Sequence, residues 1–447
     1  MSLSARTKLL LTGAIALVIG GVIAGALALI VWPVRTGSTS FVTGALGPSS
    51  AEVKYRFTIN NIEPRVELDS TIQALEARVK TLAQPMDLSE LADLYFRRAQ
   101  LTGDNKDYTR AAELAHQSLA IIAYPNGSTL TLAKLANAKH EFREALRLAH
   151  DYKGKSVGVP MIQATALLAL SDLPAAAAAA DEAVAGKPDP GTYLMRALVM
   201  QAQGRDREAA LDFAAAARTE DHGDPLGAAR LRTLWGRFLL HRGERAGAAM
   251  LFDEALRIVP DFTLAQAQRG ELLLRSGRAK EAARTFEAAF AASRQVRYLI
   301  DQARAREVDG DLQNAEAIRK QVETIVRAEL AEGGFGHRLD LIEVLTDRGN
   351  SPSLTEAVNL AREEVRLRPS AEARFQLARA YARMDSNEPA YVEIQKSLAQ
   401  GAHEAKYYEL ASRLEKRRGS AARATFYLRL ANELDPEPSG WRDQGMP

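Results

Sequence analysis

Histidine and cysteine, the side chains that most often supply metal binding or nucleophilic chemistry, form no site in this sequence of 447 residues. No two of the seven histidines stand three to five residues apart, the spacing that lets one face of a helix hold a metal ion. Cysteine is absent, which excludes thiolate nucleophiles, disulfides and cysteine-ligated metals. The glycine-rich run 333–336 lacks the G-x-G-x-x-G spacing of a nucleotide-binding loop. We therefore predict no enzyme activity, no cofactor and no metal.

Five residues recur at an offset of 34 residues in the middle of the chain. The first copy is Gly236, Gly243, Ala248, Phe252 and Ala255, and the second is Gly270, Gly277, Ala282, Phe286 and Ala289. A unit of this length, with small residues and a glycine turn, is a helix-turn-helix that cannot bury its apolar face alone. Copies must therefore stack on one another, and the low aromatic content of 6% suits packed helices.

These units resemble tetratricopeptide repeats. Residues 229–262 supply the small residues, turn glycine, aromatic residue and closing proline of that pattern, and residues 263–295 match it except at the last position, where Arg294 stands. The resemblance implies an all-α fold, a right-handed α-solenoid of about ten helix-turn-helix repeats. The predicted segments are 87–330 with about seven repeats, a glycine-rich break at 331–337, 338–438 with about three repeats, and a flexible tail at 439–447.

The resemblance also implies where a partner would bind. The first helix of each repeat lines the concave groove of such a solenoid, and its ninth position carries arginine in several units, with Glu271 interrupting the series. Arginine binds carboxylates in bidentate fashion, so an acidic or C-terminal peptide segment is the predicted ligand. A solvated arginine-rich face is the alternative. The predicted partner-binding residues are Arg230, Arg237, Glu271, Arg304, Arg379, Arg383 and Arg413.

The N-terminus predicts a membrane anchor. Residues 9–32 carry no charge and are long enough to span a bilayer as one helix, whereas a cleaved signal peptide has a shorter apolar core. Arg6 and Lys8 precede this stretch and Arg35 alone follows it closely, which favours a cytoplasmic flank at residues 1–8. We predict a single-pass protein of the bacterial inner membrane whose repeats lie in the periplasm.

Two segments could support a homodimer. Gly21 and Gly25 form a G-x-x-x-G pair in the predicted transmembrane helix, although glycine is common in such helices. The predicted membrane-proximal helix 64–84 carries a coiled-coil seam over residues 68–82, which would either pack on the first repeat or pair with a second copy. The seam residues are Leu68, Ile72, Leu75, Val79 and Leu82.

A linker is expected between the anchor and this helix, at residues 33–63. Its start is rich in glycine, serine and threonine, which is typical of a flexible tether. Apolar and polar residues alternate over 52–59, which predicts one amphipathic strand. This segment would either lie as an extended linker against the first helices or add to the sheet of a partner.

The function predicted from these features is that of a scaffold. The near-neutral charge of +2 argues against a dedicated nucleic-acid surface. We predict a membrane-anchored adaptor that binds protein partners through its groove and positions them in a cell-envelope complex for secretion, polysaccharide export or envelope assembly. The alternative is a periplasmic holdase-type chaperone, for which groove leucines 194, 198, 264 and 274 are available. An enzyme with a repeat body lacks a catalytic constellation.

Overall fold

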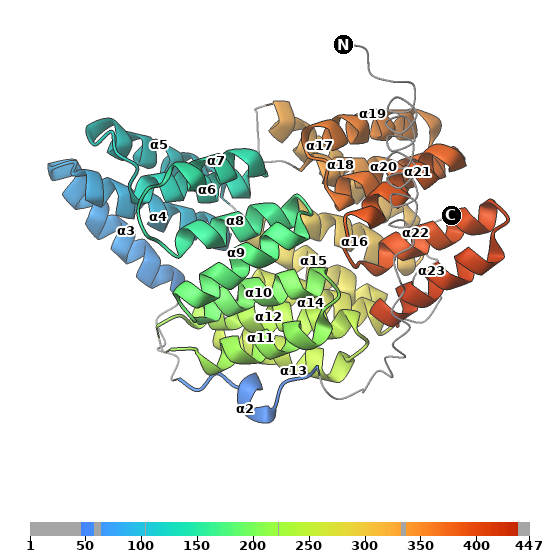
Figure 1. Cartoon of the computed structure of the whole chain (residues 1–447), viewed down its shortest axis with the longest axis horizontal. Helices are drawn as coiled ribbons and strands as arrows, with labels where there is room; N and C mark the ends of the chain where they lie inside the picture. The colour runs from blue at the N-terminus through green and yellow to red at the C-terminus, as the bar shows by residue number, and fades with distance from the viewer. Residues whose placement is uncertain (1–45, 58–63, 103, 222, 332–336, 437–447) are drawn as a thin grey trace, which may run out of the picture. The chain divides into compact units, whose positions relative to one another are not determined.

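The computed structural model describes residues 46–57, 64–102, 104–221, 223–331 and 337–436 (Figure 1). Within these ranges the chain forms 22 α-helices, α2 to α23, and no β-strand. From α4 onward the helices pair as ten hairpins, which confirms the prediction of an all-α, tetratricopeptide-like solenoid. The hairpins are α4 (Pro85–Thr102) with α5 (Asn105–Ile121), α6 (Gly127–Ala138) with α7 (Phe142–Asp151), α8 (Gly158–Ala169) with α9 (Leu173–Gly186), α10 (Pro190–Ala202) with α11 (Asp206–Arg218), α12 (Pro225–His241) with α13 (Arg245–Ile258), α14 (Thr263–Arg275) with α15 (Ala279–Ser293), α16 (Val296–Val308) with α17 (Leu312–Ala331), α18 (Arg338–Arg348) with α19 (Ser351–Leu367), α20 (Ala371–Arg383) with α21 (Asn387–Ala399), and α22 (Ala405–Arg417) with α23 (Ala421–Leu434).

The repeated glycines have two different structural roles. Gly236 lies where α12 and α13 approach most closely, because a Cβ at this position would clash with the ring of Phe252. The turn glycines Gly243 and Gly277 adopt left-handed backbone angles, with φ of 78° and 74°. Residues with a side chain are strained in that conformation, so glycine is favoured at both turns.

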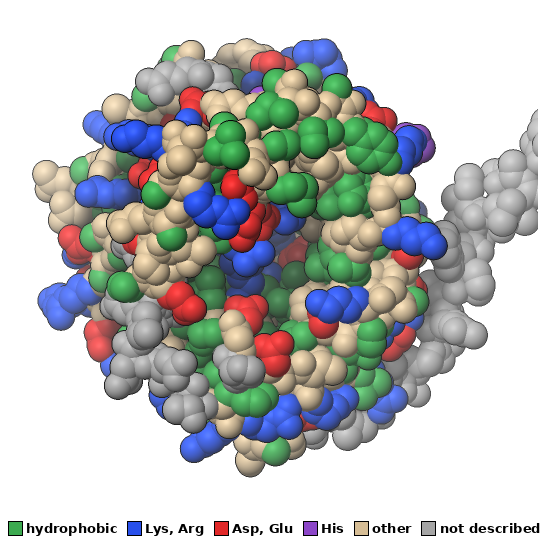
Figure 2. Space-filling model, turned by 90° about the vertical axis from the view of Figure 1, so that its left-hand side faces the viewer, with side chains coloured by type: hydrophobic (Ala, Val, Ile, Leu, Met, Phe, Trp, Pro, Cys, Tyr) green, Lys and Arg blue, Asp and Glu red, His purple; other side chains and the backbone are tan. Residues whose placement is uncertain are grey.

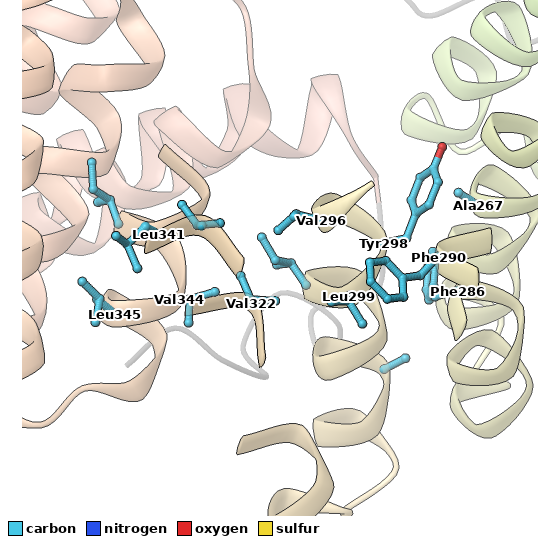
Figure 3. Close-up of a cluster of buried hydrophobic side chains, with 14 of the residues drawn as sticks. Ala267, Phe286, Phe290, Val296, Tyr298, Leu299, Val322, Leu341, Val344 and Leu345 are labelled. Atoms are coloured by element: carbon cyan, nitrogen blue, oxygen red, sulfur yellow. The ribbon is translucent and has the colours of Figure 1, made fainter. Parts of the chain in front are cut away.

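The hairpins stack so that the second helix of each one packs against the first helix of the next. One shared hydrophobic cluster runs from α14 to α20 (Figure 3). In it, Val322 of α17 lies between Leu299 of α16 and Val344 of α18 (Figure 3). Packing between α17 and α18 therefore continues on both sides of the glycine-rich run, most of which lies outside the described residues.

Turns of the early hairpins contact connections of the last hairpins, and we call this the closing interface. Four hydrogen bonds define it, from Arg368 Nη1 to His140 O (3.1 Å), Ala371 N to Ser171 Oγ (3.0 Å), His403 N to Ala202 O (3.0 Å) and Arg242 Nη1 to Leu434 O (2.8 Å). Arg275 Nη1 adds an ion pair with Asp435 at 3.0 Å. Residues far apart in the sequence thereby join, and the solenoid closes on itself.

The predicted strand at 52–59 is wrong over the part that the structure describes. Residues 50–53 form a short helix, α2 (Ser50–Val53), and the chain is then irregular to Phe57. The alternation arises because Val53 and Tyr55 are buried against α11, α12 and α13. Glu254 accepts the backbone N–H of Tyr55 at 2.8 Å, and Arg232 donates to the carbonyl of Val53 at 2.6 Å. Side chains thus satisfy the backbone groups that a strand would have left unpaired, and the segment docks in the middle of the stack rather than on its first helices.

The helix that the sequence predicts at residues 64–84 packs within its own chain. It is α3 (Pro64–Thr81), and its Ile72 and Leu75 are buried with Leu88 of α4 in one cluster. An ion pair between Asp69 and Arg98 of α4, with 3.0 Å between Oδ1 and Nη1, secures the contact. The first repeat therefore covers Ile72 and Leu75 of the predicted seam, whereas Leu82 at its end is 62% exposed. Pairing of this seam with a second copy stays a prediction.

The predicted anchor at residues 9–32, with Gly21 and Gly25, lies outside the described residues. Among the helices of the described ranges, none combines the length and apolar character needed to cross a membrane.

Candidate partner-binding cavity

The first helices of hairpins four to ten surround a cavity of about 720 Å³. Its lining contains nine arginine or lysine side chains and nine aspartate or glutamate side chains, so its formal charge is balanced. Figure 2 shows a hollow in one face of the molecule in which side chains of both charges gather. A volume of this size suits a small ligand or a short peptide segment.

Ion pairs between successive hairpins form the charged wall of this cavity. Arg297 of α16 donates to Glu343 of α18, with 2.8 Å between Nη1 and Oε2. Arg379 of α20 pairs with Asp347 of α18. These pairs join helices that are neighbours in the stack, so the wall stabilises the stacking.

The same pattern continues at both ends of this wall. Lys406 of α22 pairs with Glu372 of α20, with 2.6 Å between Nζ and Oε2. At the other end, Glu271 of α14 accepts from Arg275 at 2.9 Å and lies 3.1 Å from Nε2 of His241 on α12. Carboxylates therefore alternate with cations from one hairpin to the next.

The structure brings together five of the seven predicted binding residues. Arg237, Glu271, Arg304, Arg379 and Arg383 line the cavity. Glu271 had seemed to interrupt an arginine series, but it is the carboxylate between the cations of α12 and α16.

The other two predicted residues lie away from the cavity. Arg230 lies near Asp224 and Tyr108 of α5, and burial lowers the pKa of its guanidinium. Arg413 of α22 is not among the residues that line the cavity. The predicted groove is therefore split, and only its central part is a common site.

Burial and charge together set the protonation of the wall. Burial alone would raise the pKa of Glu271, but His241 and Arg275 outweigh it and hold that pKa well below its usual range. Burial raises the pKa of Asp340 to about 6, against the effect of Arg297 at 3.8 Å. Burial therefore favours the protonated form of Asp340, whereas the neighbouring cations keep Glu271 ionised.

Several cavity groups are not committed to the wall. Arg237 makes no hydrogen bond or ion pair with any residue that the structure describes. Arg383 donates, within the same ranges, only to the backbone oxygen of Asp347, at 3.3 Å. The side-chain oxygen of Gln376 accepts no hydrogen bond although the residue is only 4% exposed. The side-chain oxygens of Gln201 and Gln268, which also line the cavity, accept no hydrogen bond either. Buried polar groups are normally satisfied, so these groups are the ones best placed to contact a ligand.

Sequence reasoning missed the acidic half of the cavity. Asp301, Glu343, Asp347 and Glu372 line it together with the predicted arginines. Part of their signal is a repeated acidic position, because Asp301 and Glu343 stand at the same place in the consecutive first helices α16 and α18.

The leucines named for a chaperone groove divide between two places. Leu264 and Leu274 line the cavity, but charged side chains dominate the cavity wall. Leu194 and Leu198 pack instead against the core around Trp235. A continuous apolar groove is therefore not formed by these four residues.

In the described part of the chain, no three histidine, aspartate or glutamate side chains are grouped so that they could hold a metal ion.

These helical hairpins and their glycine turns define the class, an all-α, tetratricopeptide-like repeat solenoid. No known protein family and no curated protein matches the chain. Among solved structures, the chain is similar to the human IFIT1 dimer with m7Gppp-AAAA. That match has 16% sequence identity and a TM-score of 0.41, and it covers 82% of this chain and 78% of that chain.

Proposed function

We propose that this protein is a membrane-anchored scaffold that binds protein partners through its inner cavity and positions them in a bacterial cell-envelope complex. The observation that carries the proposal is the cavity itself, in which ion pairs build the wall while Arg237 and Arg383 remain available. Repeat solenoids of this class commonly use the concave face of their stack for binding.

The ligand class follows from the uncommitted groups. Two of the uncommitted charges, on Arg237 and Arg383, are guanidinium groups, which bind carboxylates through two parallel hydrogen bonds, whereas a third, on Glu404, is an exposed carboxylate. Arg297 and Arg379 are already paired with Glu343 and Asp347, so a ligand would have to displace those carboxylates to reach them. An acidic peptide segment that contacts Arg237 and Arg383 needs no such displacement.

The closing interface limits the length of that segment. Because the stack closes on itself, the cavity admits a few residues rather than a long extended peptide. A partner would therefore insert a short acidic loop or chain end.

The envelope part of the proposal rests on the sequence. Residues 9–32 have the length and composition of a transmembrane helix, and the basic residues around them favour a periplasmic repeat domain. A reporter that is active only in the periplasm, fused after the last repeat, should be active. An inactive reporter with normal expression would place the repeats on the cytoplasmic side.

Partner capture tests the cavity. We expect the double variant Arg237→Glu and Arg383→Glu to lose partners that the natural chain captures from solubilised membranes, because the reversed charges repel acidic segments. The matched control is Arg207→Glu, since Arg207 is an exposed arginine of α11 outside the cavity. Capture that is unchanged by the double variant would contradict the proposed site.

A further inference from the structure

Exposed apolar side chains gather at one end of the first hairpin. In the described part of the chain, 14 large apolar side chains are exposed, and five of them lie in two short segments, 81–86 and 119–124. The other nine are scattered along the stack, with no more than two on any helix. We call the two segments together the apolar tip. Its five exposed side chains are Leu82 (62%), Met86 (71%), Ile121 (53%), Ile122 (43%) and Tyr124 (59%).

The fold brings the two segments of the apolar tip side by side. The hydroxyl of Ser118, in the last turn of α5, donates to the carbonyl of Pro85, the first residue of α4, at 2.8 Å. The connection between α3 and α4 therefore lies against the end of α5, at the end of the stack that these three helices form (Figure 1). Side chains as exposed as these form a projecting surface rather than a groove. A concentration of apolar surface at one place marks an interaction site.

The apolar tip contains no charged residue. None stands between Lys80 and Asp87 or between His116 and Lys134, although 26% of the whole chain is charged. A protein partner is usually oriented by polar and charged groups at the rim of its interface. A lipid bilayer needs no such groups and excludes charge from its interior. Absence of charge on a projecting surface therefore favours lipid over a protein partner.

The backbone of the apolar tip also suits an apolar environment. Backbone N–H groups without a partner are costly in lipid, where no water can accept their hydrogen bonds. Here four N–H groups from both segments donate to carbonyls of the same helix end or turn, at 2.7 to 3.1 Å. These are the N–H groups of Leu82, Gln84, Ile122 and Tyr124.

Basic and aromatic side chains border the apolar tip. The last turn of α3 carries Arg78 and Lys80, both exposed, and Arg78 pairs with Asp87. The ammonium group of Lys80 can bind the phosphate of a lipid headgroup. Tyr124 has the amphipathic ring that proteins favour at the level of the headgroups.

The length of chain before the structure allows this contact. Residues 33–45 separate the predicted anchor from Leu46, the first described residue. A segment of this length reaches about 45 Å at most. A chain anchored through residues 9–32 therefore keeps its helical stack next to the bilayer.

We propose that the apolar tip inserts into the surface of the lipid bilayer to which the chain is anchored. Its five exposed side chains enter the boundary between headgroups and acyl chains, and Lys80 binds headgroup phosphates. A single anchor on a linker leaves the stack free to rotate, whereas a second contact on the folded body fixes the direction in which the cavity opens. The inference rests on the anchoring part of the proposed function.

The test uses the full chain in vesicles of phosphatidylcholine and phosphatidylglycerol. The chain has no cysteine, so Ile122→Cys carries a single fluorescent dye, and Val392→Cys, at a similarly exposed residue of α21, is the matched control. Lipids that carry a nitroxide group quench a dye that lies among them. We expect at least about threefold more quenching at position 122 than at position 392. Equal quenching at the two positions would overturn the proposal.

Flotation of the vesicles separates this inference from the anchor. Chain that floats with the vesicles but shows no quenching at position 122 overturns the contact of the apolar tip and leaves the anchoring intact. Chain that does not float overturns the anchoring, and the contact of the apolar tip with it.

Two double variants locate the contact. Met86→Asp with Tyr124→Asp should lower the quenching at position 122 to that of the control position, because charge is excluded from the bilayer interior. Leu211→Asp with Leu312→Asp, at residues of similar exposure on α11 and α17, should leave the quenching unchanged. All four residues are exposed, so neither variant removes a core contact. Energy transfer between dyes at position 122 of two copies, without quenching by lipid, would mean that a second copy covers the apolar tip and would also overturn the proposal.

Discussion

The inner surface of the stack holds arginines of two kinds. Between α16 and α20, Arg297 and Arg379 pair with carboxylates of the neighbouring hairpin, and these pairs hold the hairpins together. On α12, Arg237 occupies the same repeat position as Arg379 and has no partner among the described residues. The same repeat position therefore carries an arginine that joins neighbouring hairpins in one case and an arginine that stays available to a ligand in another, and the residue type alone does not tell which.

The largest expected difference is in stability. Arg379→Ala should lower the free energy of unfolding by about 3 kcal/mol, because it leaves Asp347, whose side chain is only 21% exposed, without its ion-pair partner. Arg237→Ala should change it by less than about 0.5 kcal/mol, since it breaks no hydrogen bond or ion pair among the described residues. Urea unfolding followed by circular dichroism measures both. Equal losses in the two variants would break the distinction between wall and binding arginines.

A second comparison concerns two turns whose glycines have the same left-handed backbone conformation. Gly243→Ala and Gly277→Ala should each lower the free energy of unfolding by about 1 kcal/mol, because alanine is strained at a left-handed φ. A Cβ at Gly243 would also lie 2.7 Å from Cγ of Pro436, whereas one at Gly277 would meet nothing within 4 Å. The free energy of unfolding should therefore fall by roughly 1 kcal/mol more in Gly243→Ala than in Gly277→Ala.

Limited proteolysis should show which part of the molecule the extra destabilisation of Gly243→Ala affects. Limited proteolysis of Gly243→Ala should release the C-terminal hairpins earlier than proteolysis of Gly277→Ala, because the substitution opens the closing interface. If the two variants are cut at the same rate, the closing interface does not hold the last hairpins.

The smallest expected effect depends on pH. The pKa of Asp340 is raised to about 6 by burial, so the folded chain binds its proton more tightly than the unfolded chain does. This group therefore lowers stability as pH rises from about 4 to 6. Asp340→Asn should be more stable than the natural chain at pH 7.5, by on the order of 1 kcal/mol, and equally stable near pH 4. Thermal unfolding at both pH values checks this, and a variant that is less stable at pH 7.5 would contradict the raised pKa.

Local features of this fold can be predicted from sequence because each repeat carries them within 34 residues. Gly236 and Phe252 specify the contact between two helices of one hairpin, and Gly243 specifies its turn. Such patterns depend on steric rules that operate over short distances in the chain. The helical stack therefore follows from the sequence, as does the placement of Arg237 and Arg379 on its inner surface.

Closure of the stack could not be predicted in the same way. The carbonyls of His140 and Ala202 accept hydrogen bonds across the closing interface, and backbone groups leave no mark in a residue pattern. The segment at 52–57 shows a related limit, because its alternation reflects burial of Val53 and Tyr55 against distant helices rather than pairing of strands. In both cases the deciding contacts join residues more than 150 positions apart.

Site-specific photo-crosslinking tests most directly whether partners enter the cavity. A photoreactive residue at Gln268, which lines the cavity, should capture a partner protein in intact cells, and one at Met250, exposed on α13, should not. Adding Arg237→Glu and Arg383→Glu should abolish the Gln268 adduct. Adducts at Met250 alone, or a Gln268 adduct that survives both charge reversals, would contradict a partner-binding cavity.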